Sequence, residues 1–264
     1  TSGPLSVLSG PVQFSFSIFF FAVLPNIFDI KCINHAYITK AIDTGFIVLS
    51  IAMKHILCFG DSNTWGYSPQ DGGRHPSDVR WTGVLQKSLG TDYRIIEEGL
   101  NGRTTFINEE GDEARPLRSG SDVLQIILES HRPLDFVIIM LGTNDLKLEF
   151  NLTVEQIAQG ARELCETVLN SEYLADNPPQ ILLISPTYIG STIMPDQEEF
   201  FKQAREKSYR FAEHYQKVAT DLGIHFLDAA QIVTPSEGEG VHWDADQHIK
   251  FGKELSNLIK AKIN

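Results

Sequence analysis

The chain is poor in cysteine and in positive charge. Its 264 residues contain three cysteines, Cys32, Cys58 and Cys165, which are too few and too scattered for a disulfide framework. Cys58 and Cys165 lie in apolar patterns and are expected to be buried thiols, which fits a reducing, cytoplasmic compartment. Lys and Arg number 22 against 34 Asp and Glu, a formal net charge of −12. Nucleic-acid partners and anionic membranes both attract clustered positive charge, so neither is expected to bind.

Long apolar runs are also missing. Residues 12–24 are rich in Phe, but polar residues interrupt them, and the run falls short of the roughly 20 apolar residues that a membrane-spanning helix needs. A secretory signal opens with positive charge, whereas the first Lys or Arg is Lys31. Stable insertion into a membrane is therefore not expected.

The first 52 residues differ in pattern from the rest of the chain, and no Met precedes Met53. We expect Met53 to be the native start, with residues 1–52 an N-terminal extension translated from a vector or from upstream sequence. Two alternatives stay open: a native extension that packs on the domain or on a neighbouring subunit, and a damaged export signal. Residues 53–264 are expected to form a single domain.

From residue 53 on, short apolar runs alternate with amphipathic helical patterns. Continuous apolar strands separated by helices are typical of parallel strands covered on both faces. Thr153 and Gln156 have the spacing of a capping box at the start of one helix. The sequence thus predicts a three-layer α/β/α domain of about five parallel strands. The strands are expected at residues 55–59, 94–96, 135–141, 180–184 and 224–227, and the helices at 78–89, 121–130, 153–169, 198–222 and 246–263.

Three polar clusters directly follow predicted strands, where the functional sites of such folds gather, and a fourth lies between the last strand and the last helix. They are GDSN (60–63), NGRTT (101–105), GTND (142–145) and EGVHWDADQH (239–248). Gly, Asp, Asn and Ser are ordinary turn residues, so each cluster alone is a weak signal. All four in order, each at the end of the sheet where sites gather, are a much stronger one.

These four clusters resemble the four blocks of the SGNH (GDSL-type) hydrolase family. The stretches ILCFGDSNTWGY, DVRWTGVLQKSLG, IIEEGLNGRTT and VIIMLGTND further resemble its bacterial arylesterase and acyltransferase branch. The similarity covers most of residues 54–264 and none of 1–52. It implies a flavodoxin-like fold and serine-dependent hydrolysis of small-molecule esters, with no cofactor and no metal. The branch implies short-chain acyl and aryl esters, acyl transfer to alcohols, and a homo-oligomer.

The resemblance also implies a catalytic role for three residues. Ser62 in GDSN matches the nucleophile, whose hydroxyl is inert at neutral pH unless a base removes its proton. His242 in EGVH matches that base. Glu239, three residues earlier, stands where the family usually has an Asp that orients the histidine. The extra methylene of Glu has to be absorbed by the loop, and Asp244 and Asp246 are the alternative acids.

The tetrahedral intermediate of ester hydrolysis carries a negative oxygen that needs preorganised donors. The family supplies three, matched here by the backbone N–H groups of Ser62 and Gly102 and the side-chain amide of Asn144. Trp65 and Trp243 are expected to line an apolar substrate pocket, with core packing as the alternative for each.

Further residues near these blocks have weaker assignments. Asp61 and Asp145 are expected to fix loop hydrogen bonds, and Trp81 to lie in the core. Arg103 is expected either to steer a polar substrate or to face solvent.

Other functions are weighed against this one. A metal-dependent phosphoesterase would need ligands such as His242, Asp244, Asp246 and His248 to converge with others from separate strand ends, and no HExxH element is present. No GxSxG motif occurs, which argues against an α/β-hydrolase. The sequence also has no Walker motif, which argues against a nucleotide-binding module. Within the same fold, carbohydrate acetyl-esterase, thioesterase and lysophospholipase activities stay open. A ligand-binding module without catalysis stays open as well.

Overall fold

The computed structural model describes residues 30–33, 36–40, 47–51, 53–108 and 116–263. The chain divides into two compact units, Thr1–Ala52 and Met53–Asn264, and each is described by itself. In the first unit β1 (Ile30–Ile33), β2 (Ala36–Lys40) and β3 (Ile47–Ile51) form an antiparallel sheet in that order. The sequence analysis did not predict these strands. The Phe-rich run at residues 12–24 lies outside the described residues.

The second unit is built on a parallel sheet of five strands. They are β4 (Lys54–Gly60), β5 (Tyr93–Gly99), β6 (Phe136–Met140), β7 (Gln180–Ser185) and β8 (His225–Asp228). Their order in the sheet is β5-β4-β6-β7-β8, and every pairing is parallel. The chain therefore leaves β4 toward one edge and later returns to its other side, which puts the topological switch point at the carboxyl end of β4. This confirms the predicted flavodoxin-like α/β fold.

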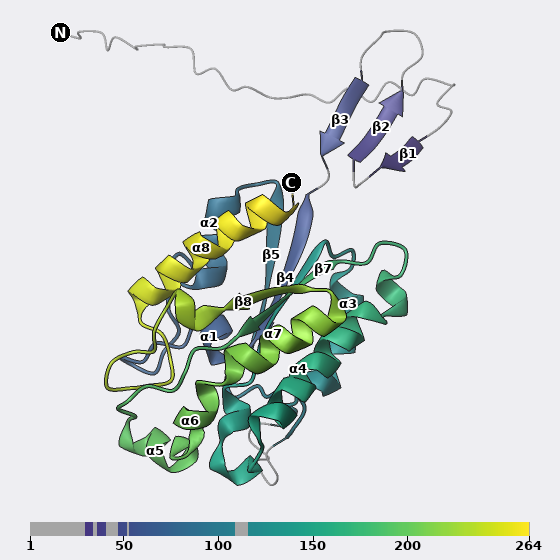
Figure 1. The fold of residues 1–264 in the computed structure, drawn as a ribbon. Helices are drawn as coiled ribbons and strands as arrows, with labels where there is room; N and C mark the ends of the chain where they lie inside the picture. Colours follow the sequence, from purple (N-terminus) through teal and green to yellow (C-terminus); the bar gives the residue numbers. More distant parts are fainter. Residues whose placement is uncertain (1–29, 34–35, 41–46, 52, 109–115, 264) are drawn as a thin grey trace, which may run out of the picture. The chain divides into compact units, whose positions relative to one another are not determined.

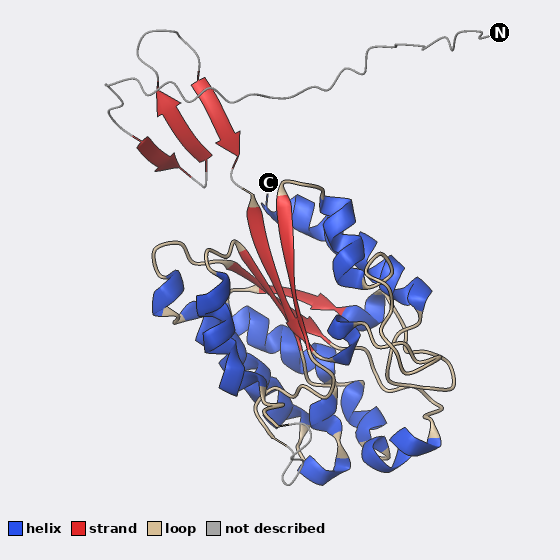
Figure 2. Cartoon of the chain, turned by 180° about the vertical axis from the view of Figure 1, so that it is seen from behind, coloured by secondary structure: helices blue, strands red, loops and turns tan. Residues whose placement is uncertain are grey.

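Helices cover both faces of this sheet (Figures 1 and 2). On one face α2 (Trp81–Leu89) packs on α8 (Ala245–Ile263). On the other lie α3 (Gly120–His131), α4 (Val154–Leu169) and α7 (Phe211–Leu222). Side chains of successive strand residues point to opposite faces. Leu57 and Phe59 accordingly enter the core under α3, α4 and α7, whereas Ile56 and Cys58 enter the core under α2 and α8.

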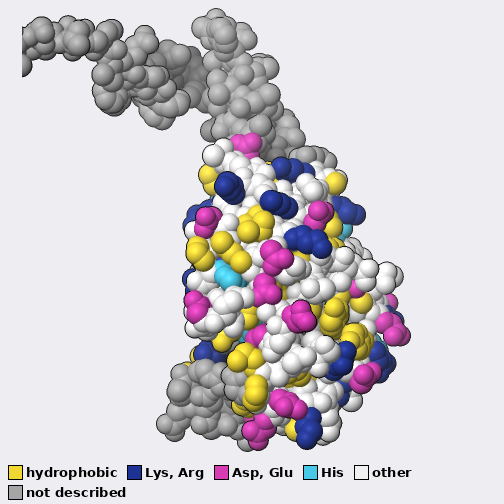
Figure 3. All heavy atoms as spheres, turned by 90° about the vertical axis from the view of Figure 1, so that its left-hand side faces the viewer, with side chains coloured by type: hydrophobic (Ala, Val, Ile, Leu, Met, Phe, Trp, Pro, Cys, Tyr) yellow, Lys and Arg dark blue, Asp and Glu magenta, His cyan; other side chains and the backbone are white. Residues whose placement is uncertain are grey.

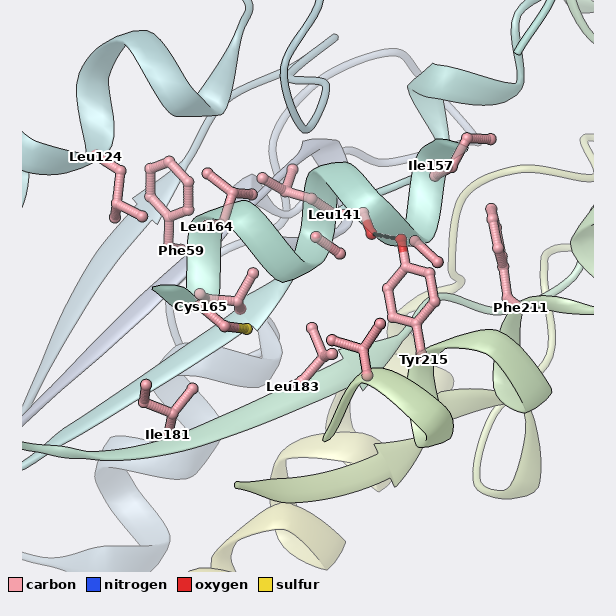
Figure 4. Close-up of a cluster of buried hydrophobic side chains, with 14 of the residues drawn as sticks. Phe59, Leu124, Leu141, Ile157, Leu164, Cys165, Ile181, Leu183, Phe211 and Tyr215 are labelled. Atoms are coloured by element: carbon pink, nitrogen blue, oxygen red, sulfur yellow. Dashed lines mark hydrogen bonds between the residues drawn. The ribbon is translucent and has the colours of Figure 1, made fainter. Parts of the chain in front are cut away.

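Figure 4 shows the first of these cores, around Phe59, Leu164 and Cys165. Tyr215 on α7 is fully buried there, and its hydroxyl donates a hydrogen bond of 2.7 Å to the carbonyl of Leu141. The end of β6 is thereby anchored directly before the GTND segment. Cys58 and Cys165 are buried free thiols, and Trp81 is fully buried, all as predicted.

The predicted helix at 198–222 is instead three helices, α5 (Pro195–Phe201), α6 (Ala204–Ser208) and α7. No Pro or Gly lies at either break, so the cause is tertiary. The Ser208 hydroxyl accepts a hydrogen bond from the backbone N–H of Ile189 (2.9 Å), and Lys207 donates one to the carbonyl of Leu152 (2.7 Å). These contacts with distant loops lie at the end of α6, where they favour the break before α7 over a continuous helix.

The other differences are small. Thr153 and Gln156 form the predicted capping box of α4. The short helix α1 (Ser62–Trp65) was not predicted. Single 3₁₀ turns also occur among the described residues: η1 (Asn144–Leu146), η2 (Leu148–Phe150), η3 (Glu172–Leu174) and η4 (Ala229–Gln231).

The surface of the second unit carries charges of both signs. On the face drawn in Figure 3, Lys and Arg are interspersed with Asp and Glu. Among the described residues, no helix has both the length and the apolarity needed to cross a bilayer. The cytoplasmic location and the absence of nucleic-acid and membrane partners stay predictions.

Candidate active site

The site begins where β4 ends. Ser62 is the first residue of α1, and Asp61 caps that helix by accepting a hydrogen bond of 2.9 Å from the backbone N–H of Asn63. The turn from strand to helix lifts the Ser62 side chain to the carboxyl edge of the sheet, at the switch point. Ser62 is 6% exposed and lines a cavity there.

The serine is joined to a histidine and a carboxylate. The hydroxyl of Ser62 lies 2.9 Å from Nε2 of His242, and Nδ1 of His242 lies 2.7 Å from Oε1 of Glu239. The second carboxylate oxygen of Glu239 accepts hydrogen bonds from the backbone N–H groups of Val241 (2.9 Å) and His242 (2.6 Å). The alternative acids point elsewhere, because Asp244 binds the Ser236 hydroxyl (2.8 Å) and Asp246 the Gln247 amide (2.9 Å).

This environment keeps Glu239 ionised. Burial alone would raise the pKa of Glu239, but the hydrogen bonds from the His242 ring and from two backbone N–H groups outweigh it and hold the pKa below its ordinary value. A carboxylate at this place fixes the proton of His242 on Nδ1 and leaves Nε2 free to accept the proton of Ser62.

Two glycines flank Glu239 in its loop. Gly238 and Gly240, on either side, have φ angles of 87° and 84°. L-residues with a side chain rarely adopt such angles, whereas glycine does so at little cost. The two turns leave Glu239 5% exposed, with one carboxylate oxygen at the Nδ1 edge of the His242 ring.

The three predicted oxyanion donors line the same cavity. Gly102 has a φ of 79°, and Asn144 is the first residue of η1, in the loop that follows β6. One amide hydrogen of Asn144 is donated to the carbonyl of Arg103 at 3.0 Å. That bond fixes the plane of the amide group, and the second amide hydrogen is left for another acceptor.

The cavity has a volume of about 320 Å³. Its aromatic wall comes from Tyr67, whose ring lies 4.1 Å from that of His242, and from Phe200 and Phe201. The full lining is Ser62, Tyr67, Asn101, Gly102, Asn144, Lys147, Gln197, Phe200, Phe201, Val241 and His242.

The two tryptophans expected in this pocket do not line it. Trp243 is fully buried in the core, where its indole N–H donates to the Thr187 hydroxyl (3.0 Å) and its ring packs on Phe251. The guanidinium group of Arg74 lies over the ring of Trp65, with its central carbon 5.0 Å from the ring centroid. The sequence could not separate these aromatic residues from Phe200 and Phe201, because α5 reaches the site only through the tertiary fold.

Arg103 neither steers a substrate nor faces solvent. It is 5% exposed, stacks on Phe59 at 4.3 Å, and donates to the backbone carbonyls of Gly60 (3.1 Å) and Glu98. Burial lowers its pKa to about 10. It thus ties together the carboxyl ends of β4 and β5, next to the site.

The two aspartates beside the site are deeply buried. Asp61 caps α1, and Asp145 accepts hydrogen bonds from the backbone N–H (3.0 and 3.1 Å) and hydroxyl of Thr105. Burial raises the pKa of each to about 6. Both accept loop hydrogen bonds, as the sequence analysis expected.

The role of Asn63, in the GDSN segment, could not be predicted from the sequence. The side-chain oxygen of Asn63 accepts a hydrogen bond from the backbone N–H of Trp243 (3.1 Å), and its amide donates to the carbonyl of Val241 (3.4 Å). The residue next to Ser62 therefore holds the peptide groups on both sides of His242. No local signal could have shown this, because 178 and 180 positions separate the partners.

The His- and Asp-containing segment at 239–248 does not converge on a single point. His242 faces Ser62, whereas His248 is fully buried and accepts a hydrogen bond of 3.4 Å from the backbone N–H of Trp81. In the part of the chain that the structure describes, no group of three or more His, Cys, Asp or Glu is placed to hold a metal ion.

Comparison with known proteins agrees with this geometry. Residues 58–254 match the family described as GDSL-like Lipase/Acylhydrolase. The chain belongs to this family. Its fold also matches a carbohydrate acetylesterase from Sinorhizobium meliloti at 35% identity and a TM-score of 0.74, covering 79% of this chain and 99% of that one.

Two further solved structures resemble the hydrolase to the same degree. The aryl esterase of M. smegmatis is 36% identical with a TM-score of 0.74, and a putative arylesterase from Agrobacterium tumefaciens str. C58 is 37% identical with a TM-score of 0.73. In both cases 79% of this chain and 99% of the other are covered. No curated protein matches the sequence. The family and these esterases identify the chain as an ester-hydrolysing enzyme.

Proposed function

We propose that the enzyme is a serine carboxylesterase for short-chain alkyl and aryl esters. Ser62 is the nucleophile, His242 the general base and Glu239 the acid that orients it. The observation that carries the proposal is the unbroken chain of contacts from the Ser62 hydroxyl to Nε2 of His242 (2.9 Å) and from Nδ1 of His242 to Glu239 (2.7 Å). A nucleophile, a base and an orienting group within hydrogen-bond reach are what acyl-enzyme chemistry requires.

The reaction proceeds in two halves. The oxygen of Ser62 attacks the ester carbonyl carbon while its proton passes to Nε2 of His242. The tetrahedral intermediate then collapses, the bond from carbon to the alcohol oxygen breaks, and the alcohol leaves with the proton from His242. Water repeats the sequence on the acyl-enzyme: its proton goes to His242, the bond to Ser62 breaks, and the acid is released.

The negative oxygen of each intermediate is stabilised by three donors. These are the backbone N–H groups of Ser62 and Gly102 and the side-chain amide of Asn144, all of which line the cavity. Donors fixed before the reaction need no reorganisation when the charge develops. The bond from Asn144 to the carbonyl of Arg103 supports this role, because it holds the amide in one orientation.

The cavity suits a small substrate. Its volume of about 320 Å³ lies at the lower end of small-molecule pockets, and Phe200, Phe201 and Tyr67 supply apolar contact. The proposal extends to acyl transfer from the acyl-enzyme to alcohols and to a homo-oligomer. Both are implied by the resemblance of the sequence to the arylesterase and acyltransferase branch.

A carbohydrate acetyl-esterase is the second candidate. Asn101 and Gln197 line the cavity, and their side chains carry amide groups. Amide groups can both donate hydrogen bonds to sugar hydroxyls and accept them. The relative from S. meliloti is named as a carbohydrate acetylesterase, which adds weight to this candidate.

The test compares wild type and Ser62→Ala on 4-nitrophenyl esters of increasing acyl length and on an acetylated monosaccharide, with EDTA in a parallel set. We expect turnover of the short esters that resists EDTA and falls at least ~10³-fold in Ser62→Ala. Activity that rises with acyl length would favour a lipase or lysophospholipase. Wild-type turnover no higher than that of Ser62→Ala would refute the serine mechanism and favour a binding module.

A further inference from the structure

A buried arginine lies where three segments of the site meet. Arg103 follows Gly102 in the chain, and its Nη1 atom donates hydrogen bonds to the carbonyls of Gly60 (3.1 Å) and Glu98. Its own backbone carbonyl accepts a hydrogen bond of 3.0 Å from the side-chain amide of Asn144. Arg103 therefore belongs to or contacts each segment that supplies a proposed oxyanion donor, namely GDSN, NGRTT and GTND.

The backbone of Arg103 also closes the turn that carries Gly102. The N–H of Arg103 donates to the carbonyl of Leu100 (3.0 Å), so Asn101 and Gly102 are the two central residues of a β-turn. Gly102 has a φ of 79°, and a positive φ at the third residue is typical of a type II turn. The N–H of Gly102 belongs to the central peptide group, which the closing hydrogen bond does not engage. This N–H is thus left for a ligand in the cavity that Gly102 lines.

Both ends of this turn are tied to a single carbonyl. The oxygen of Gly60 accepts hydrogen bonds from the backbone N–H of Leu100 (3.2 Å) and from the side chain of Arg103 (3.1 Å). Gly60 stands two residues before Ser62, so these bonds set the N–H of Gly102 relative to that of Ser62. Oxyanion donors act only when they are aimed at the place where the charge develops, and a displacement of about 1 Å can lower the rate about 10²-fold.

The side chain of Arg103 is itself held in one place. Besides its two carbonyl partners, its guanidinium group stacks on Phe59, with the central carbon 4.3 Å from the ring centroid. Burial lowers the pKa of Arg103 to about 10, so the group stays protonated at neutral pH. Hydrogen bonds from a charged donor are stronger than those from a neutral one. Lysine has neither the planar shape nor the fixed donor directions of this group.

We propose that Arg103 is a positioning residue for the oxyanion hole, which fixes the N–H of Gly102 and the side-chain amide of Asn144 relative to Ser62. This inference rests on the proposed function, since it concerns the acyl-enzyme reaction at Ser62. Arg103 is not one of the described residues that line the cavity, so it acts through them. No bond forms or breaks at Arg103 itself.

The experiment compares wild type with Arg103→Met and Arg103→Lys. The matched control is Arg80→Met, because the Arg80 side chain is also largely buried (11% exposed) and donates to Glu97 (3.2 and 2.7 Å) and to the carbonyl of His75 (2.9 Å), both outside the three segments. For each protein we would measure kcat and KM for 4-nitrophenyl acetate, the Tm, and the Ki of phenylboronic acid. This inhibitor forms a tetrahedral adduct with a serine nucleophile and so imitates the reaction's intermediate.

We expect Arg103→Met to lower kcat on the order of 10-fold to 100-fold with little change in KM, and to raise the Ki of phenylboronic acid by a similar factor. Arg103→Lys keeps the charge and should show a smaller loss in both quantities. Arg80→Met should lower the Tm and leave kcat and Ki close to wild type. Arg103→Met should cost less activity in an Asn144→Ala background than in wild type, because one of the donors that Arg103 positions is already gone.

Unchanged kcat and Ki in Arg103→Met, with a Tm lowered as in Arg80→Met, would overturn the inference and leave Arg103 a role in the fold alone. An equal loss with and without Asn144 would overturn it too, since Arg103 would then act apart from that donor. If Arg103→Met does not fold, Arg103→Lys is judged by the same two quantities, and wild-type values in it would overturn the inference. Wild-type turnover no higher than that of Ser62→Ala would count against the proposed function instead.

Discussion

At the scale of single residues, the unusual feature of the site is the acid. Glu239 stands where the SGNH hydrolases usually have an Asp. Its carboxylate forms hydrogen bonds with Nδ1 of His242 (2.7 Å) and with two backbone N–H groups. The flanking glycines set the loop for the longer side chain. Shortening the side chain by one methylene would withdraw the carboxylate from the ring, even though the charge is kept.

We therefore expect Glu239→Asp to lower kcat for 4-nitrophenyl acetate by about 10²-fold, because a misplacement of roughly 1 Å has a cost of that order. Glu239→Gln should lose about 10⁴-fold, since the neutral amide no longer fixes the tautomer of His242. Steady-state kinetics of the two variants would check this order. Wild-type activity in Glu239→Asp would mean that the loop adapts to either acid.

At the scale of elements, α1 and the loop before α8 act as one unit. Asn63, on α1 and 3% exposed, binds the carbonyl of Val241 and the N–H of Trp243. Since Ser62 and His242 are the adjacent residues, these two bonds fix the element that carries the base against the element that carries the nucleophile. Asn63 is a positioning residue in this arrangement.

Asn63→Leu, which removes both bonds, should lower kcat at least ~10-fold with little change in KM, and each buried group left unpaired should cost about 1–3 kcal/mol of stability. Asn63→Asp keeps an acceptor for the N–H of Trp243 and should lose less activity. The rate of inactivation by a serine-directed phosphonate would report on Ser62 activation directly. An unchanged inactivation rate in Asn63→Leu would show that Asn63 only supports the fold.

The elements also show what the sequence could predict. Apolar runs bounded by Gly or polar residues located all five strands of the parallel sheet to within three residues at each end, and the side chains of Thr153 and Gln156 marked the start of α4. The break between α6 and α7 was missed because the contacts beside it are made with distant loops. The strands β1 to β3 are short runs rich in Ile and Val, a β signal that the sequence analysis did not use.

The candidate site likewise has residues that the sequence could predict and residues that it could not. Its polar residues stand in three blocks at strand ends and a fourth in the loop before α8, so topology and resemblance together brought out Ser62, Gly102, Asn144, Glu239 and His242. The sequence does not show in the same way whether a large side chain points into the core or into the cavity. Trp243 follows His242 in sequence, yet it turns into the core under α8, while Phe200 on α5 supplies the wall.

At the scale of the whole molecule, buried ionisable groups tie stability to pH. His248 on α8 is fully buried between the rings of Trp243 (5.5 Å) and His75 (5.1 Å). Burial, together with the charges of His75, His242 and Arg80, lowers its pKa to about 3. Asp61 and Asp145 have the opposite effect on how stability depends on pH. Their raised pKa values of about 6 mean that the folded state takes up protons between pH 6 and 4 that the unfolded state does not, which adds stability as the pH falls.

The sign for His248 is the reverse, because its folded pKa lies below the unfolded value of about 6.5. Between these two values the unfolded state binds a proton and the folded state does not, so stability is lost as the pH falls through this window. From pH 7 to pH 5 the loss is about 2 kcal/mol. We expect wild type to lose that much more stability over this range than His248→Asn, which cannot titrate but keeps an acceptor for the N–H of Trp81.

Urea unfolding of both proteins at pH 7 and pH 5 measures this difference. Asp61 and Asp145 are present in both proteins, so their opposing contribution cancels in the comparison, and His248→Asn at pH 7 controls for the loss of packing around the ring. The same pH dependence in both proteins would mean that His248 gains a proton without unfolding. In that case the core between α2 and α8 would have to admit a charge, and the fully buried environment of His248 would not hold in solution.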